Sequence, residues 1–394
     1  MGGDGVMARL EEICSLITDG SHFSPEDEGV GYPMFSVKDM TPNGFNISGC
    51  KKIGEEAYKK LVANGCKPLN DDVVVAKDGS YLKTAFVIKG NPEITLLSSI
   101  AILRPKIDLV VPEYLSYFLK SDAVYRTVSL NYITGTALKR IILKGIRKIE
   151  VDLPDIGEQE QRAQRLSKVD YLCQLRKQQL AKLDELVKAR FVEMFGTFPA
   201  NPFRWDTGKI QDVVSDVRYG SSRPAVEGGK YPYLRMNNIT YSGELDLRDT
   251  KRIDIPDSEL DKCTVRRGDV LFNRTNSKEL VGKTCVYNRD ELMVLAGFVI
   301  RVRVNERIRP EVLSAFLNMD FSKRMLIGMC KTAIGQANIN AKELQNIDLY
   351  IPPIELQDQF VTLKNKTDQQ KQTVQQSLEK LELMKKALMQ EYFG

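Results

Sequence analysis

The sequence of this chain of 394 residues predicts two similar α+β domains, each followed by a long helix. Two observations predict this fold class: the sequence repeats at about half its length, and each copy ends in a long segment without proline or glycine. We expect the two helices to pair as an antiparallel coiled coil, with a pseudo-twofold axis relating the halves. The expected boundaries are a first domain over 1–157 with its helix over 158–196, and a second domain over 197–355 with its helix over 356–394.

The internal repeat consists of matched motifs that occur in the same order in both copies. "YPMFSVKDMTPNG" in the first copy matches "YPYLRMNNITYSG" in the second, "PEYLSYFL" matches "PEVLSAFL", and "LPDIGEQEQ" matches "IPPIELQDQ". The first copy ends in "FVEMFG" and the second in "QEYFG". Chance does not produce so many matches in one order, and the period is far too long for a solenoid. The chain therefore contains two whole domains of one fold.

Each copy begins with short strand-like runs separated by Gly, Asn, Asp and Pro. In the first copy they are "YPMFSVKDM", "DDVVVAKDG", "TAFVIKG" and "SSIAILRP"; in the second they are "YPYLRMNNI", "GDVLFNR", "KTCVYN" and "AGFVIRVRV". A short helix is expected after Pro112 and after Pro310, since proline favours the first turn of a helix. Each domain is therefore expected to be a mixed α/β domain with an irregular sheet.

The two segments without proline or glycine, 158–195 and 356–393, each predict a helix of about 37 residues, roughly 55 Å long. Their apolar side chains recur every three or four residues with polar flanks, as in a coiled-coil seam. The predicted seam residues are Leu166, Val169, Cys173, Leu180, Leu183, Val187, Phe360, Leu363, Val374, Leu378, Leu381 and Leu388. The alternative is that each helix packs only on its own domain.

Composition excludes several classes of protein. The seven cysteines are odd in number and scattered without a C-x-x-C pair, and a single histidine cannot complete a usual zinc site. No apolar run reaches the length of a membrane span, and the first residues lack the apolar core of a signal peptide. We expect a cytoplasmic protein with free thiols and no metal. The net charge of +5 permits a nucleic-acid partner without requiring one.

The stretch "TDGSHFSP" brings Asp19, Ser21 and His22 together, which are the residue types of a hydrolase site. The second copy reads "RYGSSRP", so the aspartate and the histidine are replaced there, while the glycine and the serine remain. A nucleophile needs its base, whereas a contact loop can vary its polar groups. We therefore predict no catalytic residue here, and a turn that carries contact residues.

Polar loops at matching places in the two copies carry the residue types that contact DNA. Arg, Asn and Lys read guanine and adenine edges in the major groove, and Lys, Ser and Thr suit phosphates. The candidate DNA-binding residues are Asp19, Gly20, Ser21, His22, Lys38, Lys77, Ser80, Tyr81, Lys83, Thr136, Lys139, Arg140, Tyr219, Ser221, Ser222, Arg223, Arg235, Asn237, Arg274, Thr275, Asn276, Lys278, Lys283, Gln336 and Asn338. For any one of them, a solvated loop residue is the alternative.

Over essentially its whole length, the sequence resembles the specificity (S) subunit of type I restriction–modification enzymes. The resemblance rests on "ITDGSHFSP", which is similar to the D-G-T-H-x-[TS]-P opening of that family's target-recognition domains, on the "LPDIGEQEQ" and "IPPIELQDQ" entries to the helices, on the "FG" endings and on the tandem organisation. The second copy departs from the opening motif, which puts the role of its loop in doubt.

The resemblance implies a non-catalytic DNA reader. Each domain would read one half of a bipartite site in double-stranded DNA, while the helices set the spacer and dock methyltransferase (M) subunits, two of them, with restriction (R) subunits joining the complex. S-adenosylmethionine, ATP and Mg²⁺ would belong to those partners, which agrees with the missing phosphate-loop and G-x-G-x-x-G motifs. Two alternatives remain: a coiled-coil scaffold without DNA specificity, and a self-sufficient methyltransferase or nuclease.

Overall fold

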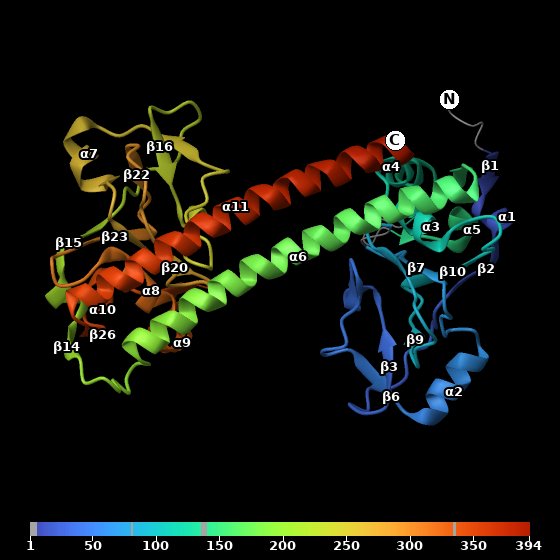
Figure 1. Ribbon diagram of the computed structural model, residues 1–394, viewed down its shortest axis with the longest axis horizontal. Helices are drawn as coiled ribbons and strands as arrows, with labels where there is room; N and C mark the ends of the chain where they lie inside the picture. Colours follow the sequence, from blue (N-terminus) through green and yellow to red (C-terminus); the bar gives the residue numbers. More distant parts are fainter. Residues whose placement is uncertain (1–5, 80–81, 135–139, 334–335) are drawn as a thin grey trace. The chain divides into compact units, whose positions relative to one another are not determined.

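The computed structural model describes residues 6–79, 82–134, 140–333 and 336–394. The chain forms two compact units: unit 1 is Met1–Arg176 with Ser377–Gly394, and unit 2 is Lys177–Gln376. Two helices of 40 residues, α6 (Ile156–Phe195) and α11 (Ile354–Phe393), each contribute to both units (Figure 1). Each helix begins two residues before the predicted start.

Unit 1 alternates short strands with short helices before α6. Its elements are β1 (Val6–Arg9), α1 (Leu10–Ile13), β2 (Cys14–Asp19), β3 (Tyr32–Phe35), η1 (Val37–Asp39), β4 (Met40–Thr41), β5 (Gly44–Phe45), β6 (Lys51–Ile53), α2 (Glu55–Ala63), β7 (Val73–Ala76), β8 (Ala85–Val87), β9 (Thr95–Leu96), β10 (Ile100–Pro105), α3 (Pro112–Leu119), α4 (Asp122–Asn131), β11 (Ile133–Thr134), β12 (Arg140–Ile141), α5 (Leu143–Arg147) and β13 (Glu150–Leu153).

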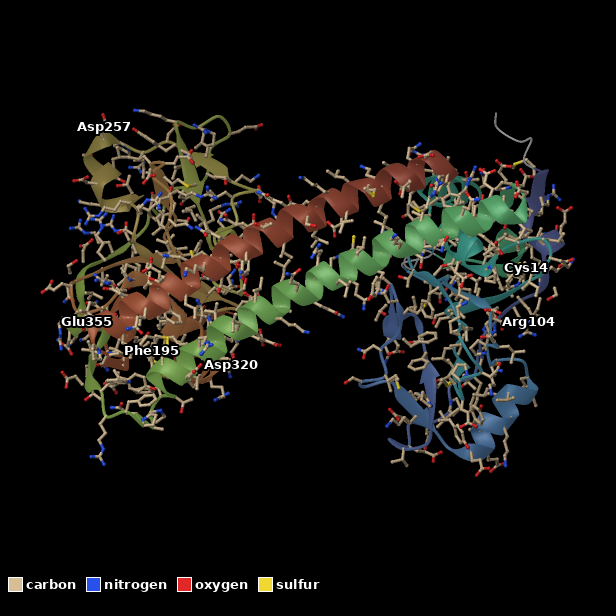
Figure 2. All side chains as sticks on the ribbon, viewed as in Figure 1. Cys14, Arg104, Phe195, Asp257, Asp320 and Glu355 are labelled. Carbon is tan, nitrogen blue, oxygen red and sulfur yellow. The ribbon has the colours of Figure 1, made fainter. Side chains whose placement is uncertain are left out.

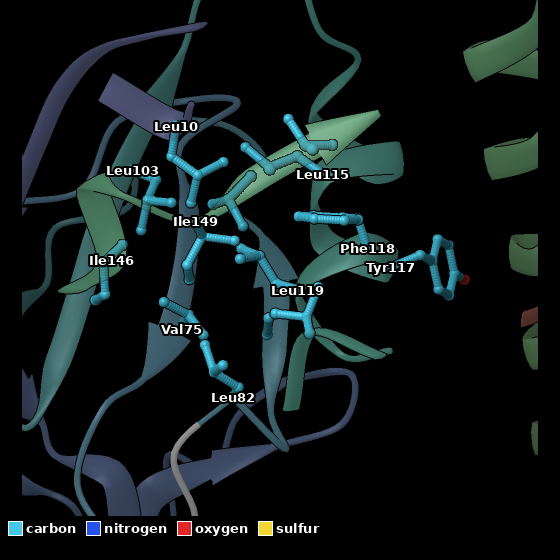
Figure 3. Close-up of a cluster of buried hydrophobic side chains, with 14 of the residues drawn as sticks. Leu10, Val75, Leu82, Leu103, Leu115, Tyr117, Phe118, Leu119, Ile146 and Ile149 are labelled. Atoms are coloured by element: carbon cyan, nitrogen blue, oxygen red, sulfur yellow. The ribbon is translucent and has the colours of Figure 1, made fainter. Parts of the chain in front are cut away.

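The main sheet of unit 1 is antiparallel, in the order β2-β10-β7-β8, and a smaller sheet has the order β6-β3-β9. Helix α3 packs on β7 and β8 and begins at Pro112, as predicted. Between them lies a core that includes Leu10, Val75, Leu115 and Ile149, all buried (Figure 3). Burial of such side chains contributes about 1.5–3 kcal/mol each, which makes this sheet a firm support for the loops at its edge.

Unit 2 repeats the pattern. Its elements are β14 (Asp206–Lys209), η2 (Ile210–Val213), β15 (Val214–Tyr219), β16 (Tyr231–Leu234), η3 (Met236–Asn238), β17 (Lys251–Ile253), α7 (Asp257–Cys263), β18 (Thr264–Val265), β19 (Val270–Asn273), β20 (Thr275–Asn276), β21 (Thr284–Val286), β22 (Met293–Leu295), β23 (Val299–Val304), α8 (Pro310–Asn318), α9 (Asp320–Met329), β24 (Lys331–Ala333), β25 (Gln336–Asn338), α10 (Ala341–Gln345) and β26 (Asp348–Ile351).

The main sheet of unit 2 has the order β15-β23-β19-β21, which matches the main sheet of unit 1 strand for strand. Each sheet also has, at the same position, an ion pair between a partly exposed arginine and a buried aspartate. Arg104 on β10 donates to the fully buried carboxylate of Asp72 at 2.8 Å, and Arg303 on β23 donates to Asp269 at 2.8 Å (Figure 2 labels Arg104). The tandem repeat read from the sequence is therefore a repeat of fold.

The two long helices run antiparallel, because early residues of α6 meet late residues of α11. In unit 1, Asp170 and Lys385 form an ion pair at 2.5 Å, and the guanidinium of Arg162 lies 5.1 Å from the ring centroid of Tyr392. In unit 2, the late residues of α6 meet the early residues of α11. Phe191, near the end of α6, packs edge-on against Phe360, near the start of α11. The predicted antiparallel coiled coil is confirmed.

The predicted seam residues differ in burial along the helices. Those that lie below a tenth exposed are Leu166, Val169, Cys173, Phe360, Val374 and Leu378, and those that are partly exposed are Leu180, Leu183, Val187, Leu363, Leu381 and Leu388. The buried ends also join the domain cores: Leu166 belongs to the core of unit 1, and Phe360 to that of unit 2. The helices thus pack on the domains as well as on each other.

A buried glutamine fixes the start of each long helix. Gln159 donates to the carbonyls of Leu109 and Pro154 and accepts from the N–H of Val111 at 2.9 Å. Gln357 makes the equivalent three bonds in unit 2, among them one from the N–H of Arg309 at 2.8 Å. These glutamines, matched in the repeat, tie each helix to the loop before α3 or α8.

Candidate nucleic-acid interface

The loop after β2, which carries the chain's histidine, is built on a close approach of two backbones. A Cβ on Gly20 would lie 2.1 Å from the carbonyl oxygen of Leu96, so only glycine fits there. Ser21 Oγ donates to the carbonyl of Phe23 at 2.6 Å and accepts from the N–H of that residue at 3.0 Å. The serine hydroxyl therefore closes a turn, and the His22 side chain, 80% exposed, faces solvent. This geometry favours a contact loop over a nucleophile with its base.

Charged side chains from three segments of unit 1 meet beside this loop. We call Asp19, His22, Lys77, Asp78 and Arg140 the unit-1 cluster. The Lys77 ammonium forms an ion pair with Asp19, and their side chains are only 9% and 13% exposed. His22 Nε2 lies 3.6 Å from the same carboxylate, and Arg140 donates to Asp78 at 3.0 Å. The cluster is thus a set of paired charges with its histidine and arginine at the surface.

The equivalent place in unit 2 carries neutral partners. We call Tyr219, Arg274, Thr275, Asn276 and Asn338 the unit-2 cluster. The guanidinium of Arg274 lies 4.8 Å from the ring centroid of Tyr219, within the range of a cation–π interaction. Strand β20, which contains Thr275 and Asn276, pairs with β25, so that Asn338 lies opposite Thr275.

Backbone hydrogen bonds show that the two clusters occupy equivalent positions. The N–H of Ile141 donates to the carbonyl of Lys77 at 2.9 Å, and the N–H of Ile339 donates to that of Arg274 at 3.0 Å. The next residues pair across the same ladder, Asp78 with Arg140 in unit 1 and Thr275 with Asn338 in unit 2. The two clusters therefore lie on equivalent backbone positions of the repeated domain, and their role in DNA binding stays a prediction.

Three polar atoms of the clusters are buried without a hydrogen-bond partner in the described part of the chain. They are Asp78 Oδ1, Arg274 Nε and Asn338 Oδ1. A buried polar atom left without a partner costs about 1–3 kcal/mol. Such atoms gain a partner when a ligand presents complementary groups, and Arg and Asn are the side chains that pair with guanine and adenine edges.

The other predicted DNA-binding residues fall into three groups. Those with exposed side chains are Lys38, Lys83, Ser222, Arg223, Asn237 and Lys278; Arg235 is partly exposed; Gly20, Ser21, Ser221 and Lys283 are buried. Ser80, Tyr81, Thr136 and Lys139 lie outside the described residues, and of Gln336 only the backbone, in β25, is described.

Several of these residues are engaged within the fold. Lys283 is buried and donates to the carbonyl of Met236 at 2.9 Å, and this burial lowers the pKa of its ammonium. Arg223 forms a bidentate pair with Glu259, whose hydrogen bond raises the pKa of the guanidinium. We therefore leave Lys283 out of the proposed interface, since its ammonium is buried and donates to a backbone carbonyl.

Sequence reasoning missed Asp78, which orients Arg140 and holds one of the unpaired atoms. The signal was present, because Asp78 stands between Lys77 and a glycine in "AKDG" after a buried strand. Asp19 is the one acidic residue among the sequence candidates, since Lys, Ser and Thr are the types that suit phosphates. A carboxylate can nevertheless accept from the amino group of cytosine.

The described residues hold no group of three or more His, Cys, Asp or Glu side chains placed to bind a metal ion. Within the same residues, every helix is too short or too polar to traverse a lipid bilayer.

Two copies of one α+β domain, each with a cluster of polar side chains and a long helix, define a tandem-repeat protein. The chain belongs to the family described as the type I restriction modification DNA specificity domain, whose model matches it twice, over 4–185 and 202–383. The match covers both units and most of both helices, so the resemblance noted in the sequence is confirmed.

Individual relatives agree with this assignment. The chain is 24% identical over 276 residues to the EcoKI specificity subunit of Escherichia coli (strain K12), an alignment that covers 66% of this chain and 59% of that protein. It is also 24% identical over 356 residues to the MjaVIII specificity subunit of Methanocaldococcus jannaschii, with 84% of this chain and 79% of that protein covered. The chain thus spans less than two thirds of the first relative's length.

Solved structures show the same fold. The S subunit of a type I restriction–modification system from M. genitalium matches with a TM-score of 0.58 at 14% identity, with 100% of this chain and 98% of that chain covered. A structure from a study of assembly and conformational transition in a type I R-M system matches with a TM-score of 0.55 at 18% identity and the same coverage. At these identities the likeness concerns the fold alone.

Proposed function

We propose that this chain is the sequence-specific DNA-binding subunit of a type I restriction–modification complex, with one half of a bipartite site read by each unit. The unit-1 cluster contacts one half-site and the unit-2 cluster the other. The chain itself carries no catalytic step.

One observation carries this proposal: the two units have different polar and charged side chains at the same backbone positions. Unit 1 presents His22 and Arg140 with carboxylates behind them, while unit 2 presents Arg274 and Asn338 with unpaired polar atoms. Each good bidentate contact to a base is worth about 1–3 kcal/mol of discrimination. Equivalent clusters with different chemistry are what two different half-sites require.

The antiparallel helices support a role in spacing and assembly. A pair of helices that also joins both domain cores connects the two readers, so its length and packing set the spacer between the half-sites. We assign to the same pair the docking of two methyltransferase subunits, which restriction subunits then join. S-adenosylmethionine, ATP and Mg²⁺ act in those partner subunits in this proposal.

The test is a genome-wide map of adenine methylation in the source cell with and without this gene. Loss of one bipartite motif on deletion is the expected result. An unchanged map while the partner methyltransferase is expressed would contradict the proposal and leave a coiled-coil scaffold as the better reading. The salt dependence of DNA binding by the assembled complex separates the two further, because phosphate contacts make affinity fall steeply with ionic strength.

A further inference from the structure

An exposed aromatic ring lies beside the unit-2 cluster. Phe298 belongs to the turn between β22 and β23, and it is 54% exposed. The turn is fixed by its backbone: the N–H of Gly297 donates to Ser221 at 2.6 Å, and the N–H of Val299 donates to Ala296 at 2.9 Å. The phenyl ring is therefore held toward solvent by a rigid support.

The backbone of this turn is hydrogen-bonded to the arginine of the cluster. The carbonyl of Phe298 accepts from the N–H of Arg274 at 3.0 Å, and the carbonyl of Gly297 accepts from its guanidinium at 3.4 Å. Tyr219, 41% exposed, lies under the same guanidinium. An apolar ring and a base-reading cation thus share one edge of unit 2.

The fold itself does not require a phenylalanine at this position. In unit 1, the N–H of Lys77 donates to the carbonyl of Ser99 at 3.0 Å, which makes Ser99 the equivalent residue. Ser99 Oγ accepts from the backbone N–H of Val37 at 3.0 Å and so serves the local structure. Phe298 makes no such bond, and leaving its ring in water forgoes the favourable free energy of burial.

We propose that Phe298 is a specificity-determining residue that packs on the 5-methyl group of a thymine in the second half-site, next to the base read by Arg274. The inference rests on the proposed function and deepens it. Phenylalanine is one of the side chains that contact the thymine methyl in the major groove. DNA is favoured over a protein partner because the backbone of the turn at Gly297 and Phe298 is hydrogen-bonded to Arg274, whose guanidinium can read a base edge, and Asn276 follows two residues later on the paired strand β20.

The test uses the complete methyltransferase complex and duplexes in which each thymine of the second half-site is replaced, one at a time, by deoxyuridine, which lacks the methyl group. For the natural chain, one replacement should weaken binding about fourfold, as expected for one buried methyl-sized group. In the Phe298→Ser variant, which carries the residue of the equivalent unit-1 position, that difference should vanish. Phe298→Leu should keep part of it.

A matched control is Phe203→Ser, because Phe203 is also an exposed phenylalanine of unit 2, at 48%, and its ring centroid lies 5.5 Å from that of Trp205. It should leave every thymine-to-uracil ratio unchanged. The inference is overturned if no thymine responds, if Phe298→Ser keeps the same response, or if that variant loses methyltransferase subunits instead. Failure of the proposed function looks different, since the natural complex would then bind without a bipartite motif.

Discussion

At the end of β2, Asp19 holds Lys77 in a nearly buried ion pair, whereas at the end of β15 the ring of Tyr219 carries the guanidinium of Arg274. The backbone around the two pairs is the same. The carbonyl of each basic residue accepts a hydrogen bond from an isoleucine N–H, that of Ile141 in unit 1 and that of Ile339 in unit 2. In unit 1 the lysine is ion-paired and nearly buried, so the exposed His22 and Arg140, the latter itself paired with Asp78, are left to face a ligand. In unit 2 the arginine keeps its charge available, because an aromatic ring orients it without neutralising it.

The difference teaches that one backbone arrangement holds two different sets of charged and polar side chains through a few substitutions. Gly20 and Gly220 are kept because a Cβ at either would lie within 2.2 Å of a carbonyl oxygen. The serines that follow them close the same turn. Specificity can change at the neighbouring side chains while the frame is preserved, as a family of readers with different targets requires.

The largest expected effect concerns stability in unit 1. Asp19→Ala leaves the Lys77 charge buried without its carboxylate, which should lower the free energy of unfolding by about 3–5 kcal/mol. Tyr219→Ala in unit 2 should cost less, about 0.5–2 kcal/mol for the cation–π contact. Urea unfolding of both variants measures the two values. The double variant Asp19→Leu with Lys77→Met should recover most of the loss, and equal costs at Asp19 and Tyr219 would break the comparison.

A smaller effect is expected at the helix pair. Leu180 and Leu183 of α6 are partly buried on its apolar stripe within unit 2. Replacing both with lysine should separate the two long helices there, because charged side chains do not pack in the apolar seam. We expect loss of methyltransferase subunits or a changed spacer in the methylation motif, read by complex mass and by sequencing of methylated DNA. Glu185→Lys, a similar change in charge at an exposed position, is the control. An intact complex with the original spacer would contradict the role given to this seam.

Much of the fold could be predicted because the repeat doubles every signal. Pro112 and Pro310 both begin short helices, and both long segments without proline or glycine are single helices. The position of the contact loop was also predictable, since the glycine–serine pair is kept in both copies. Periodicity and matched motifs report local structure and chain organisation, which are encoded by nearby residues.

The chemistry within the site was less predictable. Asp19 and Lys77 are far apart in the sequence, and nothing local shows that the second neutralises the first. The same holds for Lys283, a predicted contact whose ammonium is held by the carbonyl of Met236. Which polar side chains are paired inside the fold and which are left for a ligand depends on tertiary contacts.

The most direct test of separate readers is a pair of methylation maps, one from cells with Arg140→Ala and one from cells with Arg274→Ala. Both arginines stand at equivalent clusters, one in each unit. Our account predicts that each variant relaxes the motif in one half only, and that the two variants relax different halves. Relaxation of the same half by both variants, or equal loss in both halves, would contradict it.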